Sequence, residues 1–255
     1  MLIKLGVAGN PTICSKIEES IPWLGEHGLH EEIEFVRNVW MTEKRAEKVA
    51  ELAKKHNVEL SIHAPYYINL ANPEKAEISK KRILACCKIA EILNAGPVVF
   101  HAGYYGKDPQ KARSLIKKEC LDLSNKTRAF LGLETTGRVN QFGTLDEILE
   151  ICEEINNCVP VVDFAHIYAR SFGKVDFKEI LRKLTKYEKI HSHFSGIEIG
   201  KSGERKHTPI DNNPCFKEIA KMLLEINKPK EIMIINESPL LETDALKMKK
   251  ILEEI

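Results

Sequence analysis

Short runs rich in β-branched residues alternate with longer stretches of helical periodicity along the sequence. The runs predict eight strands, at Leu2–Val7, Glu31–Val36, Val58–His63, Pro97–His101, Ala129–Glu134, Val159–Asp163, Lys189–Phe194 and Glu231–Asn236. The stretches between them predict helices, among them Thr42–His56, Glu77–Leu93, Pro109–Lys126, Leu145–Ile155, Phe177–Thr185, Pro214–Ile226 and Thr243–Ile255. This alternation is typical of a parallel sheet covered by helices.

The number of strands favours a closed sheet. Eight strands in 255 residues leave about 32 residues for each strand–helix unit, which suits an α/β fold of the (β/α)8 TIM-barrel type, with a parallel eight-stranded sheet inside and helices outside. We therefore expect a single domain over residues 1–255. An open doubly wound sheet is the alternative, but its Gly-x-Gly-x-x-Gly phosphate loop is absent after the first strand, where the sequence reads Gly6-Val7-Ala8-Gly9-Asn10-Pro11.

Composition limits the partners that the chain can have. Thirty-eight basic and 37 acidic residues give a formal charge of +1, so any contact with nucleic acid has to be local. No apolar run approaches the ~20 residues that a membrane span needs. The sequence begins directly with a predicted strand, and its seven cysteines include no Cys-x-x-Cys pair. We expect a cytoplasmic protein with reduced cysteines and no membrane contact.

Side chains that can bind metal ions recur at the carboxyl ends of the predicted strands. In chain order they are His63, His101, Glu134, Asp163, His166, His193 and Glu237. Taken singly, each has an ordinary explanation as a hydrogen-bonded rim residue or a helix cap. In a barrel, however, these strand ends converge on one mouth, and several carboxylates buried together are unfavourable unless cations neutralise them. The pattern therefore predicts a centre with several cations.

The mixture of imidazoles and carboxylates favours zinc or another first-row ion over magnesium or calcium. Carboxylates shared between two ions about 3.5–4 Å apart support the hydrolysis of phosphate esters, because such a pair activates a water and stabilises both oxygens of the displacement. Phosphodiester cleavage is therefore the chemical hypothesis. His191 and His193 must face the same side of their strand. We assign the ligand role to His193 and a deeper supporting or packing role to His191; the reverse assignment remains open.

These strand ends and their neighbours resemble the endonuclease IV family, which comprises zinc-dependent apurinic/apyrimidinic endonucleases built on an eight-stranded barrel. The matching segments are His63–Leu70, Phe100–Gly103, Leu133–Gly137, Val162–His166, His193–Ser195 and Asn236–Pro239. Their order and spacing are specific, and they span roughly the last three quarters of the chain. The opening Leu5–Gly9 is compatible with the family but carries little information.

The resemblance implies two zinc ions that share Glu134. His63 and His101 would hold the first ion with Glu134; the second would also be held by Asp163, His193 and Glu237. The implied activity is cleavage of the phosphodiester on the 5′ side of an abasic site in double-stranded DNA, a reaction of base excision repair. A metal-activated water would attack the phosphorus, and Glu134 would be the catalytic residue that bridges the ions and orients this water.

A third zinc site of the family is incomplete in this sequence. His166 and His207 would hold that ion with an aspartate, but Arg205 occupies the position of the aspartate and Glu204 precedes it. Two alternatives remain open. Glu204 reaches the site from a shifted loop, or the site is weak or empty and Arg205 directs positive charge toward the phosphate. We expect at least two tightly held zinc ions.

The resemblance also indicates where DNA would bind. Tyr66 and Tyr67 occupy the loop from which the family inserts side chains into the duplex, and two adjacent aromatic rings can wedge into a base stack. Ordinary packing of this loop over the barrel is the alternative. We expect Arg205, with Lys201 and Lys206, to contact phosphates from a short solvated loop. The expected form of the protein is a monomer.

Two other functions compete with this one. Sugar isomerases and epimerases of the xylose-isomerase-like group hold one metal with a Glu–Asp–His–Glu quartet, and Glu134, Asp163, His193 and Glu237 satisfy that quartet. The additional histidines favour the nuclease, whereas the missing aspartate weakens that preference; these histidines are His63, His101, His166 and His207. The other alternative is a metal-stabilised barrel without catalytic activity that binds damaged DNA or a protein partner.

Overall fold

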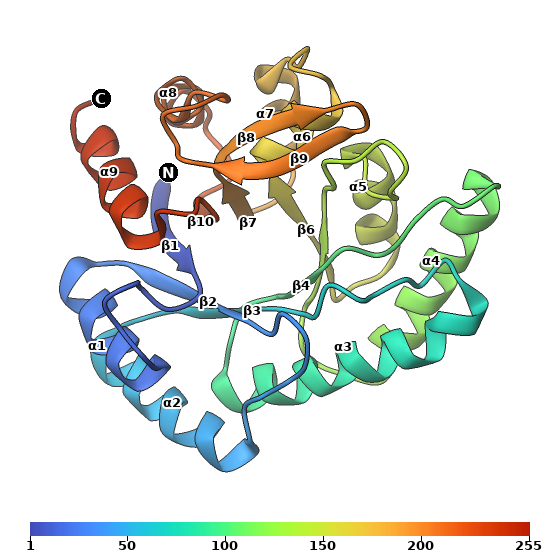
Figure 1. Ribbon diagram of the computed structural model, residues 1–255, viewed down its shortest axis with the longest axis horizontal. Coiled ribbons are helices and arrows are strands. Elements are labelled where there is room, and N and C mark those ends of the chain that lie inside the picture. Colours follow the sequence, from blue (N-terminus) through green and yellow to red (C-terminus); the bar gives the residue numbers. More distant parts are fainter.

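The computed structural model describes residues 1–255 and forms a closed barrel of eight parallel strands (Figure 1). The order around the ring is β1-β10-β7-β6-β5-β4-β3-β2. The bounds are β1 Leu2–Ala8, β2 His30–Glu34, β3 Leu60–His63, β4 Val98–Phe100, β5 Leu131–Glu134, β6 Cys158–Asp163, β7 Lys189–Phe194 and β10 Glu231–Asn236. The predicted barrel is confirmed, and the open sheet is excluded, because β1 pairs with β10 and closes the ring.

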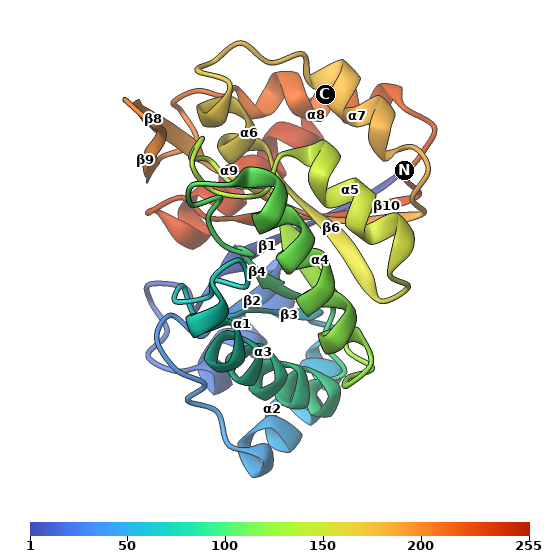
Figure 2. The same cartoon turned by 90° about the vertical axis from the view of Figure 1, so that its right-hand side faces the viewer.

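Nine helices surround the barrel. They are α1 Ile17–His27, α2 Glu43–His56, α3 Pro73–Leu93, α4 Pro109–Ser124, α5 Leu145–Glu154, α6 Phe164–Arg170, α7 Phe177–Leu184, α8 Phe216–Glu225 and α9 Leu241–Glu253. Figure 2 shows the outer face of α4 and α5. Helices α1 and α6 lie outside the predicted helical stretches, and α1 contains Pro22 in its interior. Helix α5 begins with a complete capping box between Thr144 and Glu147.

One segment differs from the sequence-based expectation. The expected solvated loop around Lys201 is an antiparallel hairpin, with β8 at Gly196–Gly200 and β9 at Gly203–Thr208. The backbone N–H of Glu204 donates to the carbonyl of Gly137 at 2.9 Å, so the hairpin rests on the loop after β5. Its glycines and exposed charges hide the strand pattern in the sequence. In Figure 1 the hairpin lies over the β6–β7 side of the barrel, and in Figure 2 it projects from one end.

The apolar core lies between the strands and the helices, and strand register determines which polar residues share a level inside the ring. On one side, Glu34 is level with His63 and Glu32 with Ser61. On the other side, Asp163 is level with His193. The barrel interior therefore has a polar layer at its carboxyl end, with a second polar level below it. None of the helices has the length and apolar character that crossing a membrane requires.

Candidate metal centre

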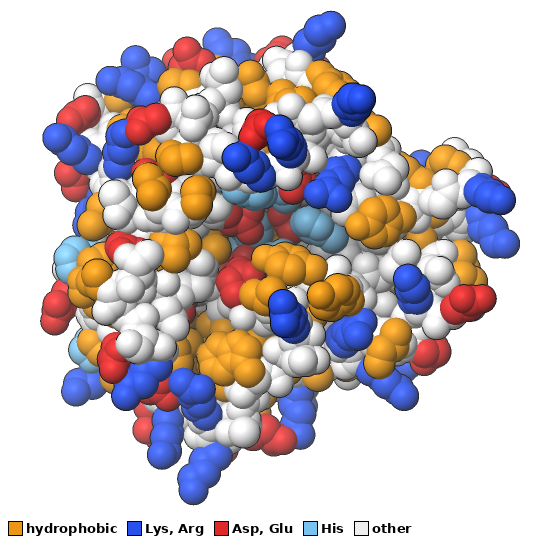
Figure 3. Space-filling view, in the orientation of Figure 1, with side chains coloured by type: hydrophobic (Ala, Val, Ile, Leu, Met, Phe, Trp, Pro, Cys, Tyr) orange, Lys and Arg blue, Asp and Glu red, His pale blue; other side chains and the backbone are white.

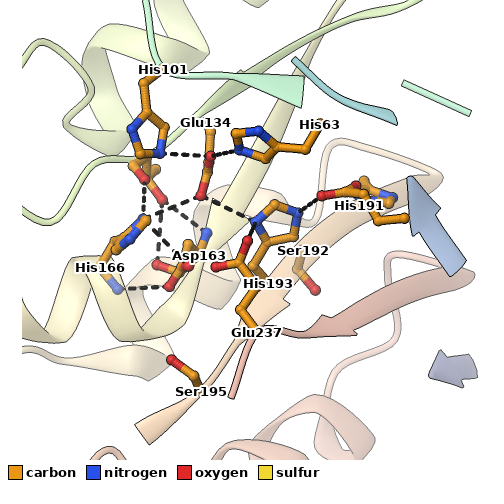
Figure 4. A network of polar contacts seen from close by, with 12 residues as sticks. His63, His101, Glu134, Asp163, His166, His191, Ser192, His193, Ser195 and Glu237 are labelled. Atoms are coloured by element: carbon orange, nitrogen blue, oxygen red, sulfur yellow. Dashed lines mark hydrogen bonds and ion pairs between the residues drawn. The ribbon is translucent and has the colours of Figure 1, made fainter. Parts of the chain in front are cut away.

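The carboxyl ends of the barrel strands surround a hollow lined by acidic and histidine side chains, visible near the middle of Figure 3. Glu134, Asp163 and His193 are almost completely buried there, and His63 nearly so. The strands place these side chains because each lies in the last two positions of its strand. The predicted convergence of the strand ends is therefore present in the structure (Figure 4).

His63, His101 and Glu134 form one group of potential metal ligands. Oε2 of Glu134 lies 3.2 Å from Nε2 of His63 and 2.8 Å from Nε2 of His101. Nδ1 of His63 lies 2.9 Å from the carbonyl oxygen of Ala64. A carbonyl oxygen and an ionised carboxylate both only accept hydrogen bonds, so both ring nitrogens of His63 face acceptors.

A second group shares Glu134 with the first and adds Asp163, His193 and Glu237. Nδ1 of His193 lies 3.1 Å from Oε1 of Glu134 and 3.2 Å from Oε1 of Glu237. Asp163 is held by its neighbours, because its Oδ1 accepts the backbone N–H of His166 at 2.7 Å and its own N–H donates to Thr135 Oγ1. The carboxylate of Glu134 therefore lies between two sets of donors.

His166 and His207 meet at a third position beside the hairpin. Their Nε2 atoms lie 3.2 Å apart, and Oε2 of Glu204 lies 3.6 Å from Nε2 of His166. Arg205 points away, with its side chain 67% exposed and paired with Glu198. Oε2 of Glu204 thus faces His166, while the group of potential ligands at this position consists of Asp163, His166, His207 and Glu237.

Burial and mutual contact shift the proton affinities in this pocket. Burial alone would raise the pKa of Glu134, but the imidazoles of His101 and His193 outweigh it and hold the pKa well below its usual range. Burial would lower the pKa of His63, but the carboxylates of Glu34 and Glu134 raise it to about 10. Burial raises the pKa of Glu237 well above normal, only partly offset by His193. The imidazoles and carboxylates of this cluster therefore shift one another's pKa values.

The donor set fits divalent metal ions. Buried atoms without a hydrogen-bond partner include Asp163 Oδ2 and Glu34 Oε1. Buried polar atoms are rarely left without partners, so their concentration in one pocket points to a ligand that binds carboxylate oxygen. Imidazole nitrogens with carboxylate oxygens are the ligands of zinc and related first-row ions.

The sequence reasoning missed two acidic residues of β2. Glu32 groups with His191 and His193, and Glu32 and Glu34 also group with Glu237. His191 lies below His193, and its Nε2 is 2.8 Å from Oε2 of Glu32. Their spacing could have revealed them. Glu32 and Glu34 are two positions apart in the strand, so they share one face, and both faces of a barrel strand are covered.

The two tyrosines expected at the DNA interface lie exposed at the mouth. Tyr66 is 60% exposed and Tyr67 61% exposed. The ring of Tyr66 is 5.6 Å from that of His63, between centroids, and so flanks the metal-binding groups. Arg82 lies over the ring of Tyr67 and donates to its backbone carbonyl at 2.8 Å. The loop thus holds two aromatic side chains beside the pocket.

Known proteins resemble this chain at several levels. An uncharacterised protein of Methanocaldococcus jannaschii is 36% identical, with all of this chain and 98% of the relative covered. A protein described as a probable endonuclease 4, from Mycoplasmopsis synoviae, is 28% identical, with 71% of this chain and 69% of the relative covered.

Solved structures share the fold. A D-tagatose 3-epimerase-like protein superposes with a TM-score of 0.74 at 23% identity, covering 98% of this chain and 96% of that protein. Endonuclease IV from Thermus thermophilus also gives 0.74, at 16% identity, covering 98% of each chain. Residues 27–253 match the family described as xylose isomerase-like TIM barrel. The protein therefore belongs to the xylose isomerase-like TIM barrel family.

Proposed function

We propose that the protein is a metal-dependent apurinic/apyrimidinic endonuclease that cleaves the phosphodiester 5′ to an abasic site in duplex DNA during base excision repair, with zinc as its metal. The observation that carries this proposal is the pair of donor groups that share Glu134. His63 and His101 add a second binding position beside the Glu134, Asp163, His193 and Glu237 quartet. A single-metal sugar enzyme has no need of that second position.

Each residue group has a defined task in this proposal. Bound divalent ions would activate a water and neutralise charge that develops on the phosphate. Glu134 would contribute to both metal positions and, as the proposed catalytic residue, would orient the attacking water. His166 and His207, with Glu204 beside His166, would provide a third position. Tyr66 and Tyr67 would stack against the bases beside the extruded abasic sugar, which is easier to extrude than a paired nucleotide.

Arg205 is proposed to contact DNA from the exposed hairpin rather than to occupy the metal pocket, because its side chain faces solvent. The formal charge of +1 limits nonspecific affinity for the DNA backbone, so the hairpin and the tyrosine loop would supply the local contacts. We further propose that the chain acts as a single-domain monomer, since one barrel supplies every donor. Seven free cysteines, most of them buried, support a reducing, cytoplasmic location.

A duplex that carries one abasic site tests the proposal. The zinc-loaded protein is expected to nick this duplex at the 5′ side and to lose the activity when a chelator is present. Glu134→Gln is expected to reduce nicking by about 100-fold or more, because it removes the shared charge while preserving side-chain size. Circular dichroism checks that this variant is folded. Binding of the abasic duplex without nicking, under any divalent metal, would instead identify a non-catalytic DNA-binding barrel.

A metal-dependent sugar epimerase or isomerase is the second candidate, favoured by the intact quartet. The two candidates differ in their need for His101. Replacing His101 with Asn is expected to suppress nicking of abasic DNA, whereas an epimerase that uses the quartet alone would retain its activity. Incubation of the wild-type protein with a panel of ketoses completes the comparison, and turnover of a ketose without nicking of DNA would favour the second candidate.

A further inference from the structure

Glu32 lies below the two donor groups that share Glu134 and belongs to neither of them. It is on β2, its side chain points into the barrel, and the residue is 0% exposed. Its Oε2 accepts the hydroxyl of Ser61 at 2.7 Å and lies 2.8 Å from Nε2 of His191. A buried carboxylate needs such partners, since an unpaired charge is strongly unfavourable in an interior. These contacts hold Glu32 in one orientation.

The other oxygen of Glu32 faces His193. Oε1 lies 2.9 Å from Nε2 of His193, at ion-pair distance, and neither atom makes a hydrogen bond to any other group. The opposite ring nitrogen, Nδ1, faces Glu134 and Glu237 at 3.1 and 3.2 Å. A neutral imidazole carries one proton. If that proton is on Nε2, toward the carboxylate, then the lone pair of Nδ1 points into the proposed metal groups.

We propose that Glu32 is a positioning residue that fixes the tautomer and ring orientation of His193, so that Nδ1 is the nitrogen presented to metal. Carboxylates that accept the second N–H of a metal-binding histidine act in this way in many metal sites. Ser61 and His191 hold Glu32 in turn. This inference rests on the metal centre of the proposed function, but it does not depend on the substrate.

The experiment compares zinc binding by the wild type and Glu32→Gln. Glutamine keeps the size of the side chain and an oxygen for Ser61, but it removes the negative charge opposite His193. The number of zinc ions bound at saturation, measured by elemental analysis, is expected to stay the same. Zinc affinity, measured by competition with a chromophoric chelator, is expected to fall about 10- to 100-fold. The visible spectrum of the cobalt-substituted protein is expected to change as well.

Glu31→Gln is the matched control. Glu31 is the preceding residue of the same strand and is equally buried, but it bonds to Ser20 rather than to the pocket. Its replacement is expected to leave zinc affinity and the cobalt spectrum unchanged. Ser61→Ala provides a second test that leaves every proposed metal ligand in place; it removes one donor to Glu32 and is expected to lower zinc affinity by a smaller factor.

Three results would overturn the inference. Unchanged affinity in Glu32→Gln would show that Glu32 does not act through His193. Loss of a whole ion at saturation would make Glu32 a ligand, as its grouping with Glu34 and Glu237 allows. An equal loss of affinity in Glu31→Gln would indicate general damage to β2. If the wild type fails to nick abasic DNA while Glu32→Gln binds zinc more weakly, the proposed function fails and this inference stands.

Discussion

Two adjacent glutamates of β2 show how partners set the behaviour of a buried carboxyl. Burial raises the pKa of Glu31 to about 8, against a hydrogen bond from Ser20 that lowers it. Burial acts on Glu32 in the same direction, but the imidazoles of His193 and His191 outweigh it and hold its pKa well below normal. The same residue type is therefore protonated on one face of the strand and ionised on the other.

Glu31 should make stability depend on pH. Its pKa in the folded protein, about 8, lies above the ordinary value of 4.5, so the folded state keeps a proton that the unfolded chain releases. The favourable contribution of the neutral carboxyl is complete below pH 4.5 and is lost progressively as the pH rises toward 8. Relative to Glu31→Gln, the wild type is expected to lose stability over this interval, by about 1.4 kcal/mol for each unit of pKa shift.

Urea unfolding of both proteins at pH 5 and pH 8 measures this difference. Because the two proteins carry the same proposed metal ligands, contributions from bound metal cancel in the comparison. A difference in the free energy of unfolding that is equal at the two pH values would contradict the prediction.

At this scale, the sequence located most of the candidate site because its members follow apolar strands. His63, Glu134 and Asp163 end their strands, and the closed barrel brings those ends together. Glu32 and Glu34 were missed because both faces of a barrel strand are buried. Their spacing shows that they share a face, but only the register with β3 shows that this face is the interior.

At the scale of elements, the hairpin β8–β9 would complete the proposed third donor position. It carries Glu204 and His207, and its contact with Gly137 brings both to His166. Gly203 makes that contact with φ near +98°, and a Cβ atom built at this position would lie 2.2 Å from the carbonyl oxygen of Gly137. The close approach therefore requires glycine.

Gly203→Ala is expected to push the hairpin away from the loop after β5. Both the positive φ and the clash oppose the native position, at about 1–3 kcal/mol for the backbone alone. We predict that the wild type binds three zinc ions at saturation and that the variant binds two. Elemental analysis of the dialysed proteins measures the ratio.

Gly106→Ala is the control that separates the effect of a positive φ from the effect of a steric clash at Cβ. Gly106 also has a positive φ, near +63°, but a Cβ atom added there would have no neighbour within 4 Å. This control is expected to keep all three ions. Equal zinc content in all three proteins would show that the hairpin does not complete the third position.

The elements that could be predicted were those in which apolar residues recur with a clear strand or helix periodicity. All eight barrel strands lie at or near their predicted positions, and strand ends such as His63 and Asp163 agree to the residue. The hairpin could not be predicted in the same way, because Gly196, Gly200 and Gly203 interrupt it and its strands do not belong to the barrel. Its formation depends on contacts with the loop after β5, which local sequence does not show.

At the scale of the molecule, the barrel gathers charges that are stable together only when neutralised. Nearby carboxylates outweigh the effect of burial and raise the pKa of His63 to about 10. Metal ions and protons therefore compete for the same donor atoms. Bound metal should also crosslink strands from opposite sides of the ring, because its ligands lie on those strands.

Zinc binding is accordingly expected to release at least one proton per chain at pH 7 and to raise the melting temperature. Affinity should rise between pH 6 and pH 8, because the imidazoles must lose their protons before they bind. Titration calorimetry in two buffers of different ionisation enthalpy measures the proton count, and thermal melting with and without chelator measures the stabilisation. Identical heats in the two buffers would refute proton release.

Closure of the ring between the first and the last barrel strands also governs the timing of assembly. Leu2 pairs with Glu231, so the edge of β1 has no neighbour on that side until β10 has been synthesised. A nascent chain presents His63, His101 and Glu134 long before Glu237 is synthesised. The proposed metal centre therefore draws donors from both ends of the chain order, and it can close only after β10 pairs with β1.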